Sequence, residues 1–144
     1  MNTFYYKDSL EPTYSIYADA YRILHRVGGP AVEYAGGYKV WFFEGKYHRV
    51  DGPAIEWSDG DKHWYIKGEL HRLDGPAVEW SNGDKKWYFE DKLHRLDGPA
   101  IERPDGHKEW WFEGKRHRLD GPSFEGKRHR VDGPAIEYAN GDTV

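Results

Sequence analysis

The sequence predicts an all-β protein, an elongated antiparallel meander of β-hairpin repeats. Two observations carry this prediction. The 144 residues contain the motif His-Arg-(Val/Leu)-(Asp/Gly)-Gly-Pro six times, mostly at a spacing of 23 residues. Alternating apolar strands flank a tight-turn dipeptide in each full repeat, as at Asp59-Gly60. A period of this length is typical of architectures in which one small unit stacks on the next.

The repeats also define the expected domain organisation. Residues 1–24 lie outside the pattern and are expected to form a short N-terminal cap, followed by a hairpin-repeat domain at 25–144. The spacing of apolar residues in the cap favours a short helix, and a degenerate edge strand is the alternative (Tyr14, Tyr17, Tyr21 and Leu24). Either would cover an open sheet edge. The units of the repeat domain are 25–47, 48–70, 71–93, 94–116, a truncated 117–128 and a partial 129–144.

Each full unit reads as about one hairpin. If Asp59-Gly60 is a two-residue loop, Ile55 pairs with Trp64. One strand face then carries Pro53, Ile55, Trp57, Trp64 and Ile66, and the other carries Ala54, Glu56, His63 and Tyr65. A second turn leads into the next His-Arg strand, at Glu44-Gly45, Lys67-Gly68, Glu90-Asp91 and Glu113-Gly114. Unit 117–128 lacks eleven residues of the pattern, which predicts an irregular junction near 121–130.

Composition indicates a thin structure held together by aromatic side chains. The chain has 24 aromatic residues and 17 glycines, yet 32% of its residues are charged. A net charge of −4 disfavours nucleic acid as a partner, because such binders are usually basic. There is no cysteine, and the first twelve residues do not resemble a signal peptide. We therefore expect a cytoplasmic protein.

The repeated polar residues are interpreted first as a structural ladder. Each Arg has carboxylates within reach, from the Asp of its own motif or from a neighbouring Glu, so an Arg–carboxylate ladder is expected. The alternative is a basic stripe that binds phosphates or anionic lipid. The ladder comprises His48, His71, His94, His117, Arg49, Arg72, Arg95, Arg118, Asp51, Asp74, Asp97 and Asp120.

The repeated histidines are interpreted as half-buried residues with satisfied hydrogen bonds. Equivalent positions in successive hairpins lie about 10 Å apart, whereas zinc needs its ligands within about 2.1 Å of one ion. A solenoid with one turn per repeat would instead stack them directly. His63 and His107 each occur in a single unit and are expected to be solvated. Almost every His, Asp and Glu has near-identical siblings, so we expect no enzyme, no metal and no cofactor.

The repeat resembles MORN repeats. The resemblance rests on an aromatic-x-x-Gly-x-x-His pattern followed by a later Asp/Asn-Gly turn, as in Tyr65 to His71 with Asn82-Gly83. The pattern recurs from Phe42 to His48 and from Trp111 to His117, and it covers residues 25–142. Here Arg follows the His where the family has Gly, a variant that looks like the divergent MORN-like repeats of bacteriophages and large DNA viruses. For a viral protein, the expected location is the host cytoplasm. The resemblance implies an elongated sheet of hairpins, a scaffold or adaptor role, sometimes self-association, and disputed contact with lipid.

These observations favour a non-catalytic protein–protein interaction module or scaffold. One alternative is a phage-encoded inhibitor that blocks a host defence protein of the anti-CRISPR or anti-restriction type. Another is binding of anionic lipid or nucleic acid through the Arg ladder. The partner is expected to be another protein or, in a homodimer, a second copy. The candidate contact face carries Phe42, Tyr65, Tyr88 and Trp111 beside Glu33, Glu56, Glu79 and Glu102. These rings would equally serve to stack across strands.

Overall fold

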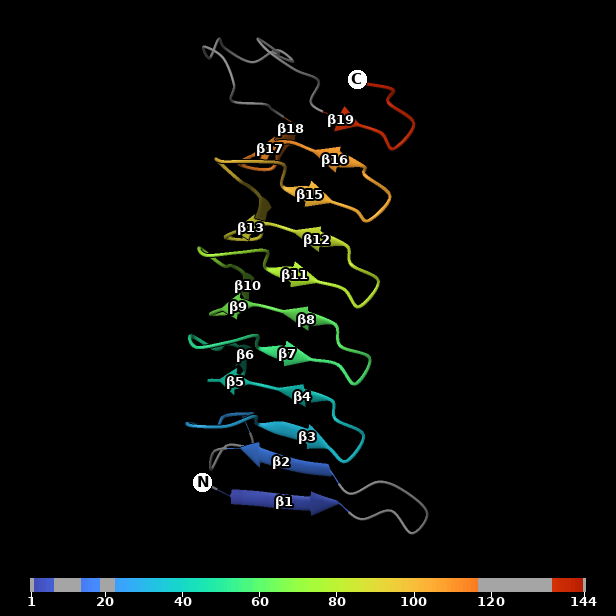
Figure 1. Ribbon diagram of the computed structural model, residues 1–144. Helices are drawn as coiled ribbons and strands as arrows, with labels where there is room; N and C mark the ends of the chain where they lie inside the picture. The colour runs from blue at the N-terminus through green and yellow to red at the C-terminus, as the bar shows by residue number, and fades with distance from the viewer. Residues whose placement is uncertain (1, 7–13, 19–22, 117–135, 144) are drawn as a thin grey trace. The chain divides into compact units, whose positions relative to one another are not determined.

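The computed structural model describes residues 2–6, 14–18, 23–116 and 136–143, which form strands and turns without a helix (Figure 1). This confirms the predicted all-β fold of antiparallel hairpin repeats. The chain divides into two compact units, residues 1–70 and 71–144. The truncated unit 117–128 and the junction expected near 121–130 lie outside the described residues. No helix capable of crossing a membrane occurs in the described part of the chain.

The first unit contains a main antiparallel sheet and two small hairpins among its described residues. Neighbouring strands of the main sheet follow the order β1 (Asn2–Tyr6), β2 (Tyr14–Ala18), β3 (Val32–Tyr34), β4 (Lys39–Val40), β7 (Ile55–Glu56) and β8 (Lys62–His63). The small hairpins pair β5 (Phe42–Phe43) with β6 (Lys46–Tyr47), and β9 (Tyr65–Ile66) with β10 (Glu69–Leu70). Each repeat thus supplies two strands to the sheet and one hairpin beside it.

The second unit has the same plan. Its main sheet follows the order β11 (Val78–Glu79), β12 (Lys85–Lys86), β15 (Ile101–Glu102), β16 (Lys108–Glu109) and β19 (Ile136–Glu137). Its small hairpins pair β13 (Tyr88–Phe89) with β14 (Lys92–Leu93), and β17 (Trp111–Phe112) with β18 (Lys115–Arg116). The 23-residue period of the sequence is therefore the period of the fold.

The N-terminal segment is a pair of strands, so the preference for a capping helix is wrong. β1 pairs with β2, and β2 pairs with β3 through Ile16 opposite Val32. Beyond this register, Tyr17 N–H donates to the Ala31 carbonyl (2.7 Å). The open edge of β3 offers backbone groups that need partners, and pairing with them outweighs the weak helical spacing of the tyrosines.

The register across the Asp-Gly turn differs by one residue from the predicted one. Ile55 lies opposite His63 rather than Trp64, and Glu56 lies opposite Lys62. The loop has three residues, because Trp57 N–H donates to the Asp61 carbonyl (3.0 Å). Only Gly60 within it has a positive φ (101°), as in a turn followed by a one-residue bulge. The expected face sorting is therefore wrong: Ile55 and His63 share a face, opposite to that of Glu56.

The second turn is the two-residue type that the sequence predicts. Lys67 and Gly68 both have positive φ, at 54° and 92°. The equivalent pairs behave alike, including Glu90-Asp91, where neither residue is glycine (49° and 59°). Such a turn matches the twist of the flanking strands. Non-glycine residues in this region are strained, so each turn depends on neighbouring contacts to hold it.

The core consists of small side chains. The alanine of each Gly-Pro-Ala step is completely buried, at Ala31, Ala54, Ala77 and Ala100. Aliphatic residues of the sheet are the next most buried, at Val40, Ile55, Val78, Ile101 and Ile136. No larger side chain among the described residues is fully buried. A fold whose buried side chains are this small depends on contacts that are repeated in every unit rather than on one large apolar core.

Candidate functional site

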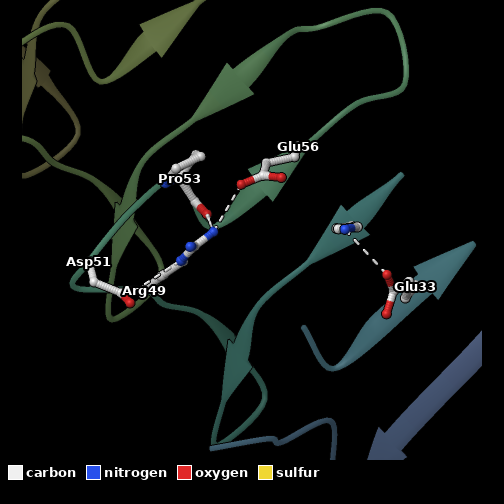
Figure 2. Close-up of polar contacts among 6 residues, drawn as sticks. Glu33, Arg49, Asp51, Pro53 and Glu56 are labelled. Carbon is white, nitrogen blue, oxygen red and sulfur yellow. Dashed lines mark hydrogen bonds and ion pairs between the residues drawn. The ribbon is translucent and has the colours of Figure 1, made fainter. Parts of the chain in front are cut away.

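The arginines of three consecutive motifs make their polar side-chain contacts within their own repeats. Arg49 Nε donates to Asp51 Oδ1 (3.0 Å), and its Nη1 donates to the Pro53 carbonyl (3.2 Å) and to Glu56 Oε1 (2.9 Å) (Figure 2). Arg72 binds Asp74, Pro76 and Glu79 in the same way, and Arg95 binds Asp97, Pro99 and Glu102. The Arg–carboxylate ladder thus consists of separate clusters, one in each of the units 48–70, 71–93 and 94–116. Arg118, Asp120 and His117 lie outside the described residues.

The guanidinium groups of Arg49 and Arg95 are stacked on aromatic rings, next to the glycine of the Gly-Pro step. The Arg49 carbon lies 4.0 Å from the Trp41 ring centre, and Arg95 lies 4.1 Å from that of Trp87. A Cβ at Gly52 would lie 2.7 Å from the Arg49 guanidinium carbon. A side chain there would have to displace the guanidinium, so glycine permits this close approach. Because its guanidinium group stacks on a ring and donates several hydrogen bonds, the arginine is held in one position and serves the fold.

The clusters carry more negative than positive charge. Each of the three joins one guanidinium to two carboxylates. The hydrogen bond from Arg49, and then its charge, lower the pKa of Asp51 below its ordinary value of 3.8; Asp74 and Asp97 are affected likewise by Arg72 and Arg95. These aspartates are fully ionised near neutral pH and lie on the surface, with side chains 84–86% exposed.

The ladder histidines support the strained turns. Lys67 N–H donates to His48 Nδ1 (3.0 Å), and Glu44 N–H donates to His25 Nδ1 (3.1 Å). Glu113 N–H donates to His94 Nδ1 (3.3 Å). His94 also lies against the Phe112 ring, 4.7 Å between centres. Each of these histidines accepts a backbone hydrogen bond at the first residue of a turn, where φ is positive.

The aromatic residues of the predicted contact face lie in the small hairpins and are half-buried. Phe42 packs on Tyr47 (4.7 Å between ring centres), and Tyr47 packs on Tyr65 (5.1 Å). Tyr88 pairs with Leu93, and its pKa is raised first by burial and then by the Asp91 carboxylate. Such contacts between rings stabilise the fold itself.

The glutamates of the predicted contact face lie in the main sheet, apart from those rings. Glu56 lies on β7, on the face opposite to His63, whose ring lies 6.3 Å from that of Tyr65. Its carboxylate is bound by Arg49. Glu79 and Glu102 are held by Arg72 and Arg95 in the same way, and Glu33 pairs with Lys39. The structure therefore does not bring the predicted aromatics and glutamates together on one face.

One repeat contains a buried polar cluster that the sequence interpretation missed. His107 Nε2 and Glu109 Oε1 are 2.9 Å apart, and both residues are 7% exposed. Trp111 Nε1 donates to Glu109 Oε2 (3.1 Å). Burial raises the pKa of Glu109, but the hydrogen bonds from His107 and Trp111 and the Arg116 charge outweigh it, so the pKa is lowered. The expectation that His107 is solvated is wrong, and the alternation of residues 107, 109 and 111 is the signal that could have revealed it.

His63 also differs from the sequence expectation. Its ring packs edge-on against Trp57, 4.5 Å between centres, and the residue is half-buried. The register explains this position, since His63 lies opposite the buried Ile55. His63 is therefore part of the packed face rather than a solvated side chain.

The third position of the motif is apolar and exposed. Val27, Val50, Leu73 and Leu96 are 70%, 82%, 81% and 67% exposed, the four highest values among large apolar side chains of the described residues. All six copies of the motif carry Val or Leu there. We call these four residues the aliphatic loop positions. Single exposed apolar residues are common on protein surfaces. An apolar residue that is exposed at the same place in successive repeats buries little surface on folding, so stability of the fold does not explain why it recurs.

A groove lies between two of these positions in the second unit. It has a volume of about 780 Å³ and is lined by Arg72, Leu73, Asp74, Gly75, Pro76, Trp87, Phe89, His94, Arg95, Leu96 and Asp97. Phe89, 38% exposed, belongs to the wall. The groove thus combines apolar side chains with two exposed carboxylates at its rim. The sequence signal for it was the invariant Val/Leu.

Within the described ranges, no three His, Cys, Asp or Glu side chains gather in a way that could hold a metal ion. Comparison with known proteins adds no identity. No family model matches the sequence, and neither a curated protein nor a solved structure matches it. The function must therefore be argued from the residues themselves.

Proposed function

We propose that this protein is a non-catalytic protein-binding module that makes contact through the aliphatic loop positions. The observation that carries the proposal is their exposure, up to 82%, at the same place in successive repeats. The repeat varies elsewhere on its surface, as at Lys46, Glu69 and Lys92, yet this position stays aliphatic. Burying such side chains against a partner releases about 25 cal/mol per Å² of apolar surface.

The charges of the loops favour a protein over an anionic partner. Arg49, Arg72 and Arg95 each donate to two carboxylates, which offset the cationic charge that phosphate binding needs. Binding to anionic lipid or nucleic acid through the Arg ladder is accordingly disfavoured. The aromatic face first predicted from the sequence is a weaker candidate than the loops, because its rings pack on one another and its glutamates are ion-paired.

The MORN-like character of the repeat is part of the same proposal. It is supported by the two-residue turns with glycine at Gly45, Gly68 and Gly114, which follow the aromatic-x-x-Gly pattern of the sequence. A stack of such hairpins repeats one contact position many times. That property suits a scaffold or adaptor.

Selection from a random 12-residue peptide library displayed on phage tests the binding function. The immobilised proteins are the wild type, the double variant Leu73→Ser/Leu96→Ser and the control Tyr34→Ser, which removes an exposed ring outside the loops. Peptides selected on the wild type should bind the control equally well and the double variant at least about 10-fold more weakly. A 10-fold change in affinity corresponds to about 1.4 kcal/mol, and the loss of one buried leucine contact costs more than that. Failure to select peptides that depend on the leucines would contradict the proposed function.

A further inference from the structure

We infer that the groove between Leu73 and Leu96 binds a basic segment of a partner protein, in which lysine or arginine lies beside apolar residues. The inference rests on the proposed binding function and specifies the partner's chemistry. The groove provides two different features for such a segment. Its lining is apolar, and its rim carries the two exposed carboxylates of Asp74 and Asp97.

The apolar part of the partner is specified by the lining. Leu73 and Leu96 belong to consecutive repeats and are separated by two strand spacings, about 10 Å. Phe89 and Pro76 complete the apolar surface between them. About three residues of extended chain span that distance, so a short linear segment can contact both leucines. Side chains of aliphatic or aromatic character match this surface.

The basic part of the partner is specified by the charge balance. In the groove lining, the guanidinium groups of Arg72 and Arg95 are balanced by the carboxylates of Asp74 and Asp97, and these two carboxylates are the exposed charges at the rim. The neighbouring hollow supplies one negative charge in excess, because it is lined by Glu90 and Glu113 against the single cation of Lys92. A cationic segment is therefore attracted, and an acidic one is repelled.

The rim carboxylates are available for this role. Arg72 Nε and Arg95 Nε each contact only Oδ1 of the rim aspartate, at 2.9 Å. The side chains of both aspartates are 84% exposed. A carboxylate has about four acceptor positions, so an incoming Lys or Arg can bind without displacing the internal arginine. Partner binding thus leaves the structural cluster intact.

The test is the amino-acid composition of the peptides that the library yields. Peptides that require Leu73 and Leu96 should contain Lys and Arg at least about twice as often as the unselected library, and Asp and Glu less often. Repeating the selection on Asp74→Asn/Asp97→Asn should remove this bias while the apolar preference remains. Selection on the wild type in 0.5 M salt, which needs no variant, should also reduce the bias because salt screens surface charge.

Each other result overturns a defined part of the account. Leucine-dependent peptides with no basic bias, or with a bias unchanged in the Asn variant and in salt, would overturn this inference and leave the binding function standing. Absence of leucine-dependent peptides would overturn both. Sedimentation of the wild type as a dimer that Leu73→Ser/Leu96→Ser converts to a monomer would assign the groove to a second copy of this chain, and would also overturn the inference.

Discussion

The first and second motifs of the chain differ at one residue and in the charge around their arginines. Arg49 binds Asp51 and Glu56, whereas the position equivalent to Asp51 in the first motif is Gly28. The first-motif glutamate, Glu33, pairs with Lys39 at 3.3 Å instead (Figure 2). Arg26 nevertheless occupies the equivalent place. Its Nη1 donates to the Pro30 carbonyl (3.0 Å), and its guanidinium carbon lies 3.8 Å from the Tyr17 ring centre.

The comparison separates what positions the arginine from what sets its charge. The aromatic ring, the close glycine and the proline carbonyl are present in both motifs, so these three position the guanidinium. The carboxylates differ, so they are not required for that placement. They add negative charge to the loop, which is the property that the proposed partner would recognise.

The largest effect is expected from the glycine that both motifs share. Gly52→Ala places a Cβ 2.7 Å from the Arg49 guanidinium carbon and displaces it from Trp41 and both carboxylates. We expect a loss of about 2 kcal/mol, because charge-assisted hydrogen bonds are broken. The matched control is Gly36→Ala, where nothing lies within 4 Å of the new Cβ and no change is expected. Urea denaturation of both variants measures the difference, and equal stability would show that the arginine is not held as described.

Replacing arginine by lysine should cost more in the second motif than in the first. Lysine cannot form the forked contacts of Arg49 with Asp51, Pro53 and Glu56, whereas Arg26 loses one such contact, to Pro30. We expect a loss of about 1.5 kcal/mol for Arg49→Lys and less than about 1 kcal/mol for Arg26→Lys. The same denaturation experiment compares them. A larger loss of stability for Arg26→Lys than for Arg49→Lys would show that the carboxylates contribute less to holding the arginine than the ring does.

The histidines should behave alike in the two motifs. His25 and His48 each accept a backbone N–H at the start of a turn, from Glu44 and Lys67. Substitution of either by alanine leaves that donor without its partner and should cost about 1 kcal/mol in unfolding free energy. Lys62→Ala, at an exposed position on β8, is the control and should change little. Unequal losses at His25 and His48 would show that the motifs differ in more than charge.

The smallest effect is a dependence on pH that the first motif lacks. Arg49 lowers the pKa of Asp51 below 3.8, whereas Gly28 has no carboxyl. A lowered pKa means that the ion pair stabilises the fold above about pH 4, and that this contribution is lost as the pH falls further. Asp51→Asn should therefore reduce the loss of stability between pH 5 and pH 3, measured by thermal unfolding. An unchanged acid profile would show that the Arg49–Asp51 contact contributes nothing.

The sequence predicted the fold because the fold is periodic. The 23-residue spacing, the second turn and the arginine follow from residues that recur in successive repeats, and so do its carboxylates from the second motif on. The register did not follow, since Asp59-Gly60 suits a two-residue loop and a three-residue one equally. In the structure the Asp59 side chain accepts the Asp61 N–H (3.2 Å), which stabilises the longer loop. Because side chains alternate between the two faces of a strand, this shift of one residue in the register placed each side chain of the second strand on the face opposite to the predicted one.

Features confined to one repeat were harder to predict. The N-terminal tyrosines fit a helix or a strand, and the open edge of β3 decided between them. His107 and Glu109 have no counterparts in other units, so nothing in the period indicated that they are buried together. The aliphatic loop positions were visible in every motif, but exposure cannot be read from a residue type, and Val or Leu beside His suggests burial first.

The most direct test of the account is to map where a peptide selected on the wild type binds. Methyl groups of Leu73 and Leu96 report on the groove, and the rings of Tyr88 and Trp111 report on the aromatic face first predicted from the sequence. Both sets can be followed by NMR during one titration. The account predicts that the leucine methyl signals shift with saturation while the ring signals stay in place. Shifts confined to Tyr88 and Trp111 would contradict it and return the contact surface to the aromatic hairpins.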